Sequence, residues 1–297
     1  MSVSTNIVLS DTNWLAKVRA YSQLLKFRLS FIVTFSAAIA YCLGAGDLLN
    51  YFDLFYFAIG GFLITGSANI INQVIEKDLD KLMTRTQNRP LPTDVLDKKE
   101  AIIFCVIIGL IGLYIHLSIN ILTFSISFLS LILYGFVYTP LKRVGPIAVF
   151  VGAFPGAFPP LIGWVAATGE ISYLALILFG VQFLWQFPHF WAIAWVSHDD
   201  YHKAGFKLLP SSGGRDLSTA FTMMIYSLFL IPASILPFMI GATGKTSAII
   251  VLITGLLFLA QTFLLMKRCD KKSAKQMMFG SFFYLPIVQI AYVLDKI

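Results

Sequence analysis

Residues 69–92 read NIINQVIEKDLDKLMTRTQNRPLP, a stretch that begins inside a long apolar segment and ends in a charged loop. Asn72, Glu76 and Asp80 follow one another at intervals of four residues, so on a helix their side chains share one face. Arg85 and Arg89 come next. Carboxylate and amide oxygens suit a hard cation such as Mg²⁺, and arginine binds phosphate oxygens. The stretch therefore indicates a site for a metal–diphosphate at the edge of a membrane.

The composition of the chain is that of a membrane protein. Of the 297 residues, 58% are hydrophobic and 12% are charged, and the mean hydropathy is +0.79. These values exclude a soluble globular domain. Because apolar runs recur throughout, we predict one membrane domain over residues 1–297, in which residues 1–26 form a cytoplasmic lead-in. The net charge of +7 is assigned to basic cytoplasmic loops, so the expected partner is the lipid bilayer and not nucleic acid.

Nine apolar segments divide the chain, and most approach the roughly 20 residues that a helix needs to cross the hydrocarbon core. We therefore predict an all-α fold: a polytopic membrane bundle of about nine transmembrane helices around a central cavity, with cytoplasmic catalytic loops. The segments lie near residues 29–46, 52–75, 101–118, 120–139, 146–167, 171–195, 219–241, 246–266 and 276–294.

The basic residues indicate how this bundle is oriented. Of the 22 Lys and Arg residues, all but Lys245 and Lys296 lie in the N-terminal lead-in or in the loops after the second, fourth, sixth and eighth segments. Positive charge concentrates on the cytoplasmic side of membrane proteins. We therefore expect the N-terminus in the cytoplasm and the C-terminus outside.

A second polar cluster lies at the end of the sixth segment, in the sequence WQFPHFWAIAWVSHDDYHKAGFKLLP of residues 185–210. On a straight helix four polar side chains there share one face, namely Gln182, Gln186, His189 and Asp200. Asp199 directly precedes Asp200, and Lys203 follows it. The cluster is a candidate for a second set of metal and phosphate contacts.

The two acidic clusters occupy corresponding places in the chain. Asp80 and Asp200 each follow an even-numbered apolar segment, and each precedes a basic loop that ends in Leu-Pro. This pattern favours two tandem four-helix halves that face one another, with the ninth helix appended. Facing acidic clusters would hold more than one metal ion around a diphosphate.

Further candidate residues lie between the two clusters. Lys142 and Arg143, in the sequence YTPLKR of residues 138–143, belong to the same membrane side as both clusters. The fifth segment contains VGAFPGAFPPLIGW, and we expect its glycines and prolines to interrupt the helix, as in helices that line a cavity. Gly152 and Gly156 also predict close helix packing.

Plainer interpretations exist for several of these residues. Glu76 and Asp80 together could form an ordinary solvated helix end, and Lys142 with Arg143 could reflect only the inside-positive bias. His189 could be a hydrogen-bonded structural histidine, which is also our interpretation of His116. Asp78 lies off the face of the three predicted ligands, and we expect it to be solvated or to support them indirectly.

On these residues the chain resembles the UbiA-type intramembrane prenyltransferase superfamily. The first motif of that superfamily is matched by Asn72, Glu76 and Asp80, by the pair at 85–86 and by the three residues at 89–91. Four blocks of this sequence resemble the branch of the superfamily that farnesylates heme: NQVIEKDLD, VGAFPGAFPPLIGW, WQFPHFW and DDYHKAGFKLLP. Glu76 stands where many members carry Asp, and the second motif has fewer acids than in the quinone-biosynthesis members. Which of Asp199 and Asp200 contacts metal therefore stays open.

The resemblance implies an Mg²⁺-dependent prenyltransferase of the bacterial inner membrane. It implies transfer of the farnesyl group of farnesyl diphosphate to a vinyl group of heme B, with addition of water, to give heme O and diphosphate. A downstream heme-modifying enzyme or terminal oxidase assembly is the implied partner. The implied metal ligands are Asn72, Glu76, Asp80 and Asp200, with Asp199 as a further catalytic acid; the implied substrate contacts are Arg85, Arg89, Lys142, Arg143, Lys203, Gln186 and His189.

Two other functions are weighed against this one. A prenyltransferase acting on an aromatic quinone precursor would use the same metal site, but the heme-like blocks argue against it. A secondary transporter would place its acids near the bilayer midplane. Here the acids and basic loops gather at one membrane edge, which favours an enzyme.

Overall fold

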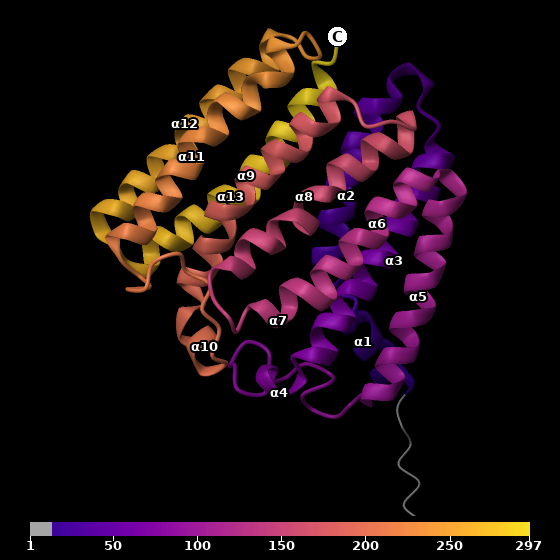
Figure 1. Ribbon diagram of the computed structural model, residues 1–297, viewed down its shortest axis with the longest axis vertical. Coiled ribbons are helices and arrows are strands. Elements are labelled where there is room, and N and C mark those ends of the chain that lie inside the picture. Colours follow the sequence, from indigo (N-terminus) through magenta and orange to yellow (C-terminus); the bar gives the residue numbers. More distant parts are fainter. Residues whose placement is uncertain (1–13) are drawn as a thin grey trace, which may run out of the picture.

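The computed structural model describes residues 14–297, so the first half of the predicted lead-in lies outside the described residues. In the part described, every regular element is a helix, and one isolated antiparallel bridge pairs Thr243 with Lys296. The long helices run alongside one another in a single bundle (Figure 1). The predicted all-α class is confirmed.

Nine helical spans within residues 14–297 are long and apolar enough to cross a membrane, as predicted. The fourth continues from α6 through the π-helical turn η2 (Leu133–Tyr138) into α7 (Thr139–Leu141). The helices that form the spans are α2 (Phe27–Ala45), α3 (Tyr51–Ile75), α5 (Lys98–Ile119), α6 (Ile121–Ile132), α8 (Ile147–Thr168), α9 (Tyr173–Val196), α11 (Leu217–Met239), α12 (Lys245–Arg268) and α13 (Lys271–Leu294).

The largest boundary difference is at α13, which begins at Lys271 rather than near residue 276. Asp270 caps this helix, because its side chain accepts a hydrogen bond of 2.7 Å from the Ser273 backbone N–H. The cap satisfies the first turn before the apolar run starts, so the helix takes in a basic turn that hydropathy alone assigns to the loop.

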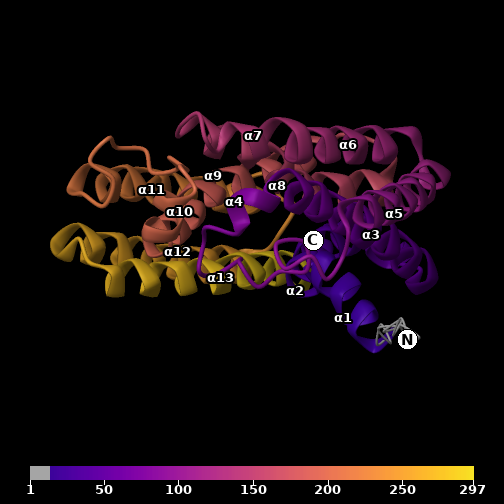
Figure 2. The same cartoon turned by 90° about the horizontal axis from the view of Figure 1, so that it is seen from below.

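Three short helices lie at one end of the bundle: α1 (Trp14–Leu24), α4 (Lys77–Asp80) and α10 (His198–Lys203). α7 lies at the same end, and the C-terminus is at the opposite end (Figure 1). Seen from the end that carries these short helices, α4 and α10 are neighbours over the middle of the bundle (Figure 2). Both acidic clusters are therefore at one end, as the alternation of basic loops predicts.

The helix α8 forms the centre of the packing, in contact with α2, α6 and α9. Small residues bring its backbone close to its neighbours, because a side chain at Gly163 would collide with the Ala37 carbonyl of α2. A Cβ at Gly152 would meet the Tyr138 ring, and one at Gly156 would meet Gln186. The predicted close packing at Gly152 and Gly156 is confirmed.

The prediction that this fifth span is interrupted is wrong, because α8 runs unbroken through its three prolines. Pro159 and Pro160 lack the N–H groups that would bond the carbonyls of Pro155 and Gly156. Neighbouring helices supply the missing donors: Ser130 Oγ lies 3.5 Å from the Pro155 oxygen, and Gln182 Nε2 donates to the Gly156 oxygen at 2.7 Å. Repairs of this kind keep a proline-rich helix continuous inside a membrane.

A buried polar network ties the ninth span to the rest of the bundle. Gln289 of α13 donates to Ser36 of α2 at 2.7 Å and to Gln182 of α9 at 2.9 Å. Ser36 in turn donates to Gln182 at 2.8 Å.

Elsewhere in the bundle, His116 is 1% exposed and bonds Ser127 and the Phe57 carbonyl, the structural role expected for it.

Candidate active site

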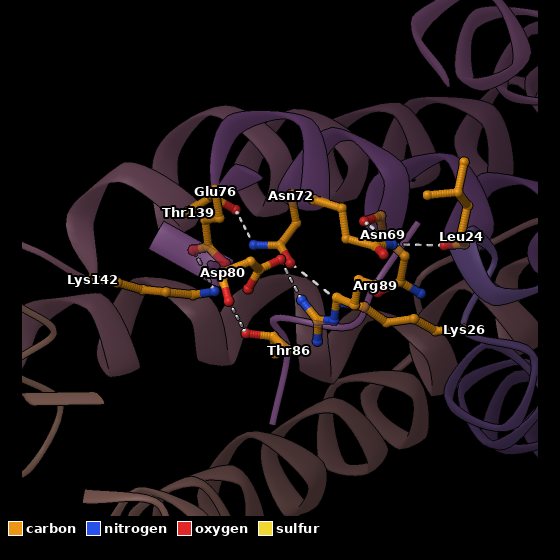
Figure 3. Close-up of polar contacts among 11 residues, drawn as sticks. Leu24, Lys26, Asn69, Asn72, Glu76, Asp80, Thr86, Arg89, Thr139 and Lys142 are labelled. Atoms are coloured by element: carbon orange, nitrogen blue, oxygen red, sulfur yellow. Dashed lines mark hydrogen bonds and ion pairs between the residues drawn. The ribbon is translucent and has the colours of Figure 1, made fainter. Parts of the chain in front are cut away.

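Asn72, Glu76 and Asp80 lie together at the junction of α3 and α4 (Figure 3). The backbone ladder continues across this junction, because Glu76 N–H bonds Asn72 O at 2.9 Å and Asp80 N–H bonds Glu76 O at 2.7 Å. The helical spacing therefore keeps the three side chains on one face. All three are buried, and Asp80 is 0% exposed. Asp78, off that face, is exposed, as expected.

Each buried carboxylate is paired with a cation from another segment. Lys142 Nζ donates to Glu76 Oε1 at 2.8 Å, and Arg89 Nη1 donates to Asp80 Oδ2 at 2.7 Å. Thr86 Oγ1 donates to the Asp80 backbone oxygen at 2.9 Å, which folds the loop carrying Arg89 back over the acids. The plainer interpretation of Glu76 and Asp80 as a solvated helix end does not hold.

The π-helical turn η2 explains how Lys142 reaches α3. Pro140 has no N–H to bond the carbonyl one turn earlier, and the chain widens into η2 just before it. Thr139 Oγ1 donates to the Tyr134 carbonyl at 2.9 Å, and Asn72 Nδ2 lies 3.4 Å from the Thr139 oxygen. Thr139 and Lys142 are thereby held on the side of this span that faces the acids.

Lys26 joins this group of candidate residues, although the sequence does not reveal it. Its Nζ donates to Asn72 Oδ1 at 3.2 Å, although 46 positions separate the two residues. The backbone of Lys26 is left-handed (φ 47°, ψ 55°), a conformation that costs a non-glycine residue about 1–3 kcal/mol and tends to occur at functional sites. In the sequence it is one of several basic residues before the first span, where the inside-positive bias accounts for it fully.

The electrostatics of this group favour an added anion. Desolvation, followed by the positive charges of Arg89 and Lys142, lowers the pKa of the Lys26 ammonium to about 7. Burial alone would lower the pKa of Lys142, but the Glu76 carboxylate raises it above its ordinary value. Two carboxylates here face three basic side chains, and the hydrogen bond of Lys26 goes to an amide. An anionic ligand would stabilise the charged form of Lys26.

The donor set also fits a hard cation. Asp80 Oδ1 is buried and has no hydrogen-bond partner, which costs about 1–3 kcal/mol for such a group. Asn72 and Glu76 present further oxygens on the same face. Within residues 14–297 no three His, Cys, Asp or Glu side chains form a metal-binding group. Two acids and an amide leave room for phosphate and water oxygens, the usual companions of Mg²⁺.

The second acidic cluster reaches the first through the backbone. Asp200, on α10, accepts hydrogen bonds of 3.2 Å from the N–H groups of both Thr84 and Arg85. Asp199 is exposed and accepts a bond of 3.0 Å from Arg215. The two clusters therefore meet, but Asp200 does not join Glu76 and Asp80 in one group of acids. Its assignment as a metal ligand stays a prediction.

The predicted phosphate contacts divide into a set that contacts the buried acids and an exposed set. Arg89 and Lys142 are inside the site, in contact with the acids. Arg85, Lys203 and Arg143 are exposed. The Arg85 guanidinium lies 5.9 Å from the centre of the Tyr201 ring, and Lys203 Nζ lies 3.2 Å from Asp200 Oδ1. Arg143 follows α7 at the surface.

The polar side chains of the sixth span do not continue in line to Asp200, because Ser197 (φ −97°, ψ 12°) ends α9 and a new helix follows. Gln186 packs against Gly156, as described above. His189 is 9% exposed, bonds Ser281 Oγ of α13 at 2.8 Å and stacks on Trp185 with ring centres 4.3 Å apart.

One aromatic path connects this histidine with the acidic group. The ring of Phe190 lies 5.5 Å from that of His189 and 6.4 Å from that of Tyr138, centre to centre. Tyr138 in turn lies 4.8 Å from Lys142 Nζ. The histidine and the paired acids therefore face one continuous aromatic region of the bundle.

The UbiA prenyltransferase family matches residues 32–285. The chain belongs to the UbiA prenyltransferase family. Among its relatives, protoheme IX farnesyltransferase of Cytophaga hutchinsonii is 53% identical over 285 residues, which is 95% of this chain and 99% of the relative. Protoheme IX farnesyltransferase of Flavobacterium psychrophilum is 44% identical, over 93% of this chain and 94% of the relative.

Solved structures of the UbiA family share the fold of this chain. A structure of digeranylgeranylglyceryl phosphate synthase superposes with a TM-score of 0.79 at 21% identity, over 94% of this chain and 98% of that one. A UbiA homologue from Archaeoglobus fulgidus bound to GPP and Mg²⁺ superposes with a TM-score of 0.70 at 15% identity, over 92% and 99%. The chain is thus a multi-pass membrane protein with the fold of a UbiA prenyltransferase.

Proposed function

We propose that this chain transfers the farnesyl group of farnesyl diphosphate to a vinyl group of heme B, with addition of water, giving heme O and diphosphate. One observation supports the binding of a diphosphate: a buried Asp80 oxygen that has no hydrogen-bond partner lies beside Lys26, Arg89 and Lys142. The choice of heme as the acceptor rests on the relatives of this chain, which are 41–53% identical to it and are named protoheme IX farnesyltransferase. One membrane domain spanning residues 1–297 carries this activity, a proposal that the family match over 32–285 supports.

The side chains of the site have distinct roles in this reaction. Asn72, Glu76 and Asp80 hold Mg²⁺, which when bound supplies positive charge to the leaving diphosphate. Arg89 and Lys142 bind diphosphate oxygens, and Lys26 adds a third positive charge. At about 4 Å one such charge pair is worth about 4 kcal/mol at an effective dielectric of 20. Several contacts together would supply much of a barrier reduction of roughly 8 kcal/mol or more.

In the proposed reaction the farnesyl group is joined to heme in three steps. The allylic C–O bond of farnesyl diphosphate breaks, and diphosphate leaves with the electron pair. The π electrons of the heme vinyl group form the new C–C bond, which leaves a cation on the vinyl carbon next to the porphyrin. Water adds to this cation and releases a proton, giving the hydroxylated side chain. The apolar bundle limits other water from reaching the allylic cation.

His189 is our candidate contact for heme. The Ser281 hydroxyl donates its single proton to the Met278 carbonyl at 2.6 Å, so it accepts from Nδ1–H of His189. The lone pair of the neutral ring is then on Nε2, the arrangement that an iron ligand requires. Stacking on Trp185 fixes the plane of the ring. Gln186, one turn earlier, is proposed as a wall of the same pocket.

Replacing His189 by glutamine is expected to raise KM for heme B by roughly tenfold or more, since a contact of about 1.4 kcal/mol or more is removed. KM for farnesyl diphosphate is expected to change less than about twofold, because the paired acids and cations are untouched. Steady-state kinetics with each substrate varied in turn measure both values. His202→Gln is the matched control, an exposed histidine on α10. An unchanged KM for heme B in His189→Gln contradicts the assignment.

Lys26→Met is expected to raise KM for farnesyl diphosphate by roughly tenfold, because one charge-assisted contact to the anion is worth about 1.5–3 kcal/mol. Methionine keeps most of the length of the side chain and has no better access to the left-handed backbone. Arg28→Met, an exposed neighbour, is the control and is expected to leave KM unchanged. If both variants behave alike, Lys26 contributes only to the general basic charge of the lead-in.

We also propose an orientation, a location and a partner for this chain. The N-terminus in the cytoplasm, the C-terminus outside and the bacterial inner membrane follow from the basic residues and from the bacterial relatives. Arg85, Arg143 and Lys203 attract the diphosphate from the exposed side of the site, and Asp199, which pairs with Arg215, is a further acid on α10. A downstream heme-modifying enzyme or terminal oxidase assembly takes the product.

A further inference from the structure

The short helix α10 holds the loop after α4 through three successive kinds of contact. The Asp200 carboxylate accepts from the N–H groups of Thr84 and Arg85, one on each oxygen, at 3.2 Å each. Lys203 Nζ donates to Thr84 Oγ1 at 3.1 Å. The Tyr201 ring lies under the Arg85 guanidinium. Residues 84–85 therefore meet α10 with both backbone and side chains.

The loop needs this support between two buried anchors. On one side, Met83 is 2% exposed and packs in the main apolar core. On the other, Thr86 is 1% exposed and bonds the Asp80 carbonyl. Thr84 and Arg85 between them are exposed. Without Asp200 their N–H groups would bond only water.

We infer that Asp200 is a positioning residue: its carboxylate orders residues 84–85 and so sets the direction of the arginines that meet the diphosphate, instead of binding the metal. Two adjacent backbone N–H groups form a small anion site, and here the anion is supplied by the protein. Both oxygens of Asp200 are already engaged, and Lys203 adds a further bond at 3.2 Å. Asp80, in contrast, keeps an oxygen without a partner.

Hydrogen exchange of the backbone in a peptide covering Thr84 and Arg85 tests this inference on the purified full chain. Asp200→Ala is expected to speed exchange there by roughly tenfold, since it removes a charge-assisted bond from each N–H. Asp200→Asn keeps the shape and one acceptor oxygen, so an intermediate increase is expected. Asp199→Asn is the matched control: it is adjacent and exposed, pairs with Arg215 instead, and is expected to leave the exchange unchanged.

Kinetics then separate positioning from metal binding; this second readout rests on the proposed function. We expect Asp200→Ala to raise KM for farnesyl diphosphate about tenfold while the Mg²⁺ concentration for half-maximal rate changes less than about twofold. A tenfold rise in that Mg²⁺ concentration, with exchange at Thr84 and Arg85 unchanged, overturns the inference and makes Asp200 a metal ligand. If the wild type makes no heme O, the proposed function fails, and the exchange measurement still decides the role of Asp200.

Discussion

Replacing Asp80 by asparagine is expected to lower the rate of heme O formation by roughly 10³-fold, with the protein still folded. Asp80 is fully buried, its Oδ2 pairs with Arg89, and its Oδ1 has no partner. Asparagine keeps the size and an acceptor for Arg89 but removes the negative charge that a divalent cation needs. A 10³-fold loss corresponds to about 4 kcal/mol of transition-state stabilisation.

Single-turnover rates at saturating Mg²⁺ and farnesyl diphosphate measure this loss. The control is Asp78→Asn, an exposed aspartate on the same short helix, for which a change of less than about twofold is expected. A rate for Asp80→Asn within about tenfold of the wild type would remove Asp80 from the metal site.

The second large effect concerns stability and comes from the buried pair of Lys142 and Glu76. Lys142→Met is expected to destabilise the metal-free protein by about 3–5 kcal/mol, because it leaves the Glu76 carboxylate buried without its cation. Adding Glu76→Gln is expected to recover most of that loss, since replacing both charges of a buried pair is often neutral. Both the single and the double variant are expected to have lower activity than the wild type, because the phosphate contact is missing in each.

Unfolding in detergent micelles with a chelator at pH 7 measures these differences. The Glu76 carboxylate holds the pKa of the Lys142 ammonium above its ordinary value, so Lys142 is charged at pH 7 and the stability that it contributes is lost as the pH rises through that higher value. The control is Lys77→Met, which breaks the exposed 2.6 Å pair with Asp94 and is expected to cost less than about 1 kcal/mol. A double variant as unstable as Lys142→Met alone contradicts this account of the pair.

The predictable part of the site is the part that depends on local spacing. Asn72, Glu76 and Asp80 share a face because a helix repeats every 3.6 residues, and the ladder continues through the junction of α3 and α4. The nine spans and the common end of both acidic clusters follow from hydropathy and from the basic loops for a similar reason. Each of these properties is carried by neighbouring residues.

The unpredicted part depends on contacts between distant segments. Lys26 meets Asn72 only because α2 packs beside α3. The left-handed backbone of Lys26 has no signature in the sequence that would have predicted it. The partners of Asp200 are backbone N–H groups. Every residue except proline has such a group, so the residue types in the sequence do not indicate this contact. The unbroken α8 depends on donors from Ser130 and Gln182, whereas its own prolines predict an interruption.

The arrangement also bears on the two competing functions. The paired acids lie at the junction of α3 and α4, and α4 is at the same end of the bundle as α1, α7 and α10 (Figure 1). A secondary transporter would hold its acids near the midplane. A quinone-precursor prenyltransferase would share the acids and cations described here. The acceptor is therefore the point at which the proposal differs from its nearest alternative.

A competition assay tests the acceptor directly. The purified chain is incubated with Mg²⁺, farnesyl diphosphate and equal concentrations of heme B and 4-hydroxybenzoate, and the products are identified by mass spectrometry. We expect a heme with the added mass of one farnesyl group and one hydroxyl group, its formation dependent on Asp80 and on Mg²⁺. A farnesylated benzoate with no change in heme would contradict the proposed function and favour the quinone pathway chemistry.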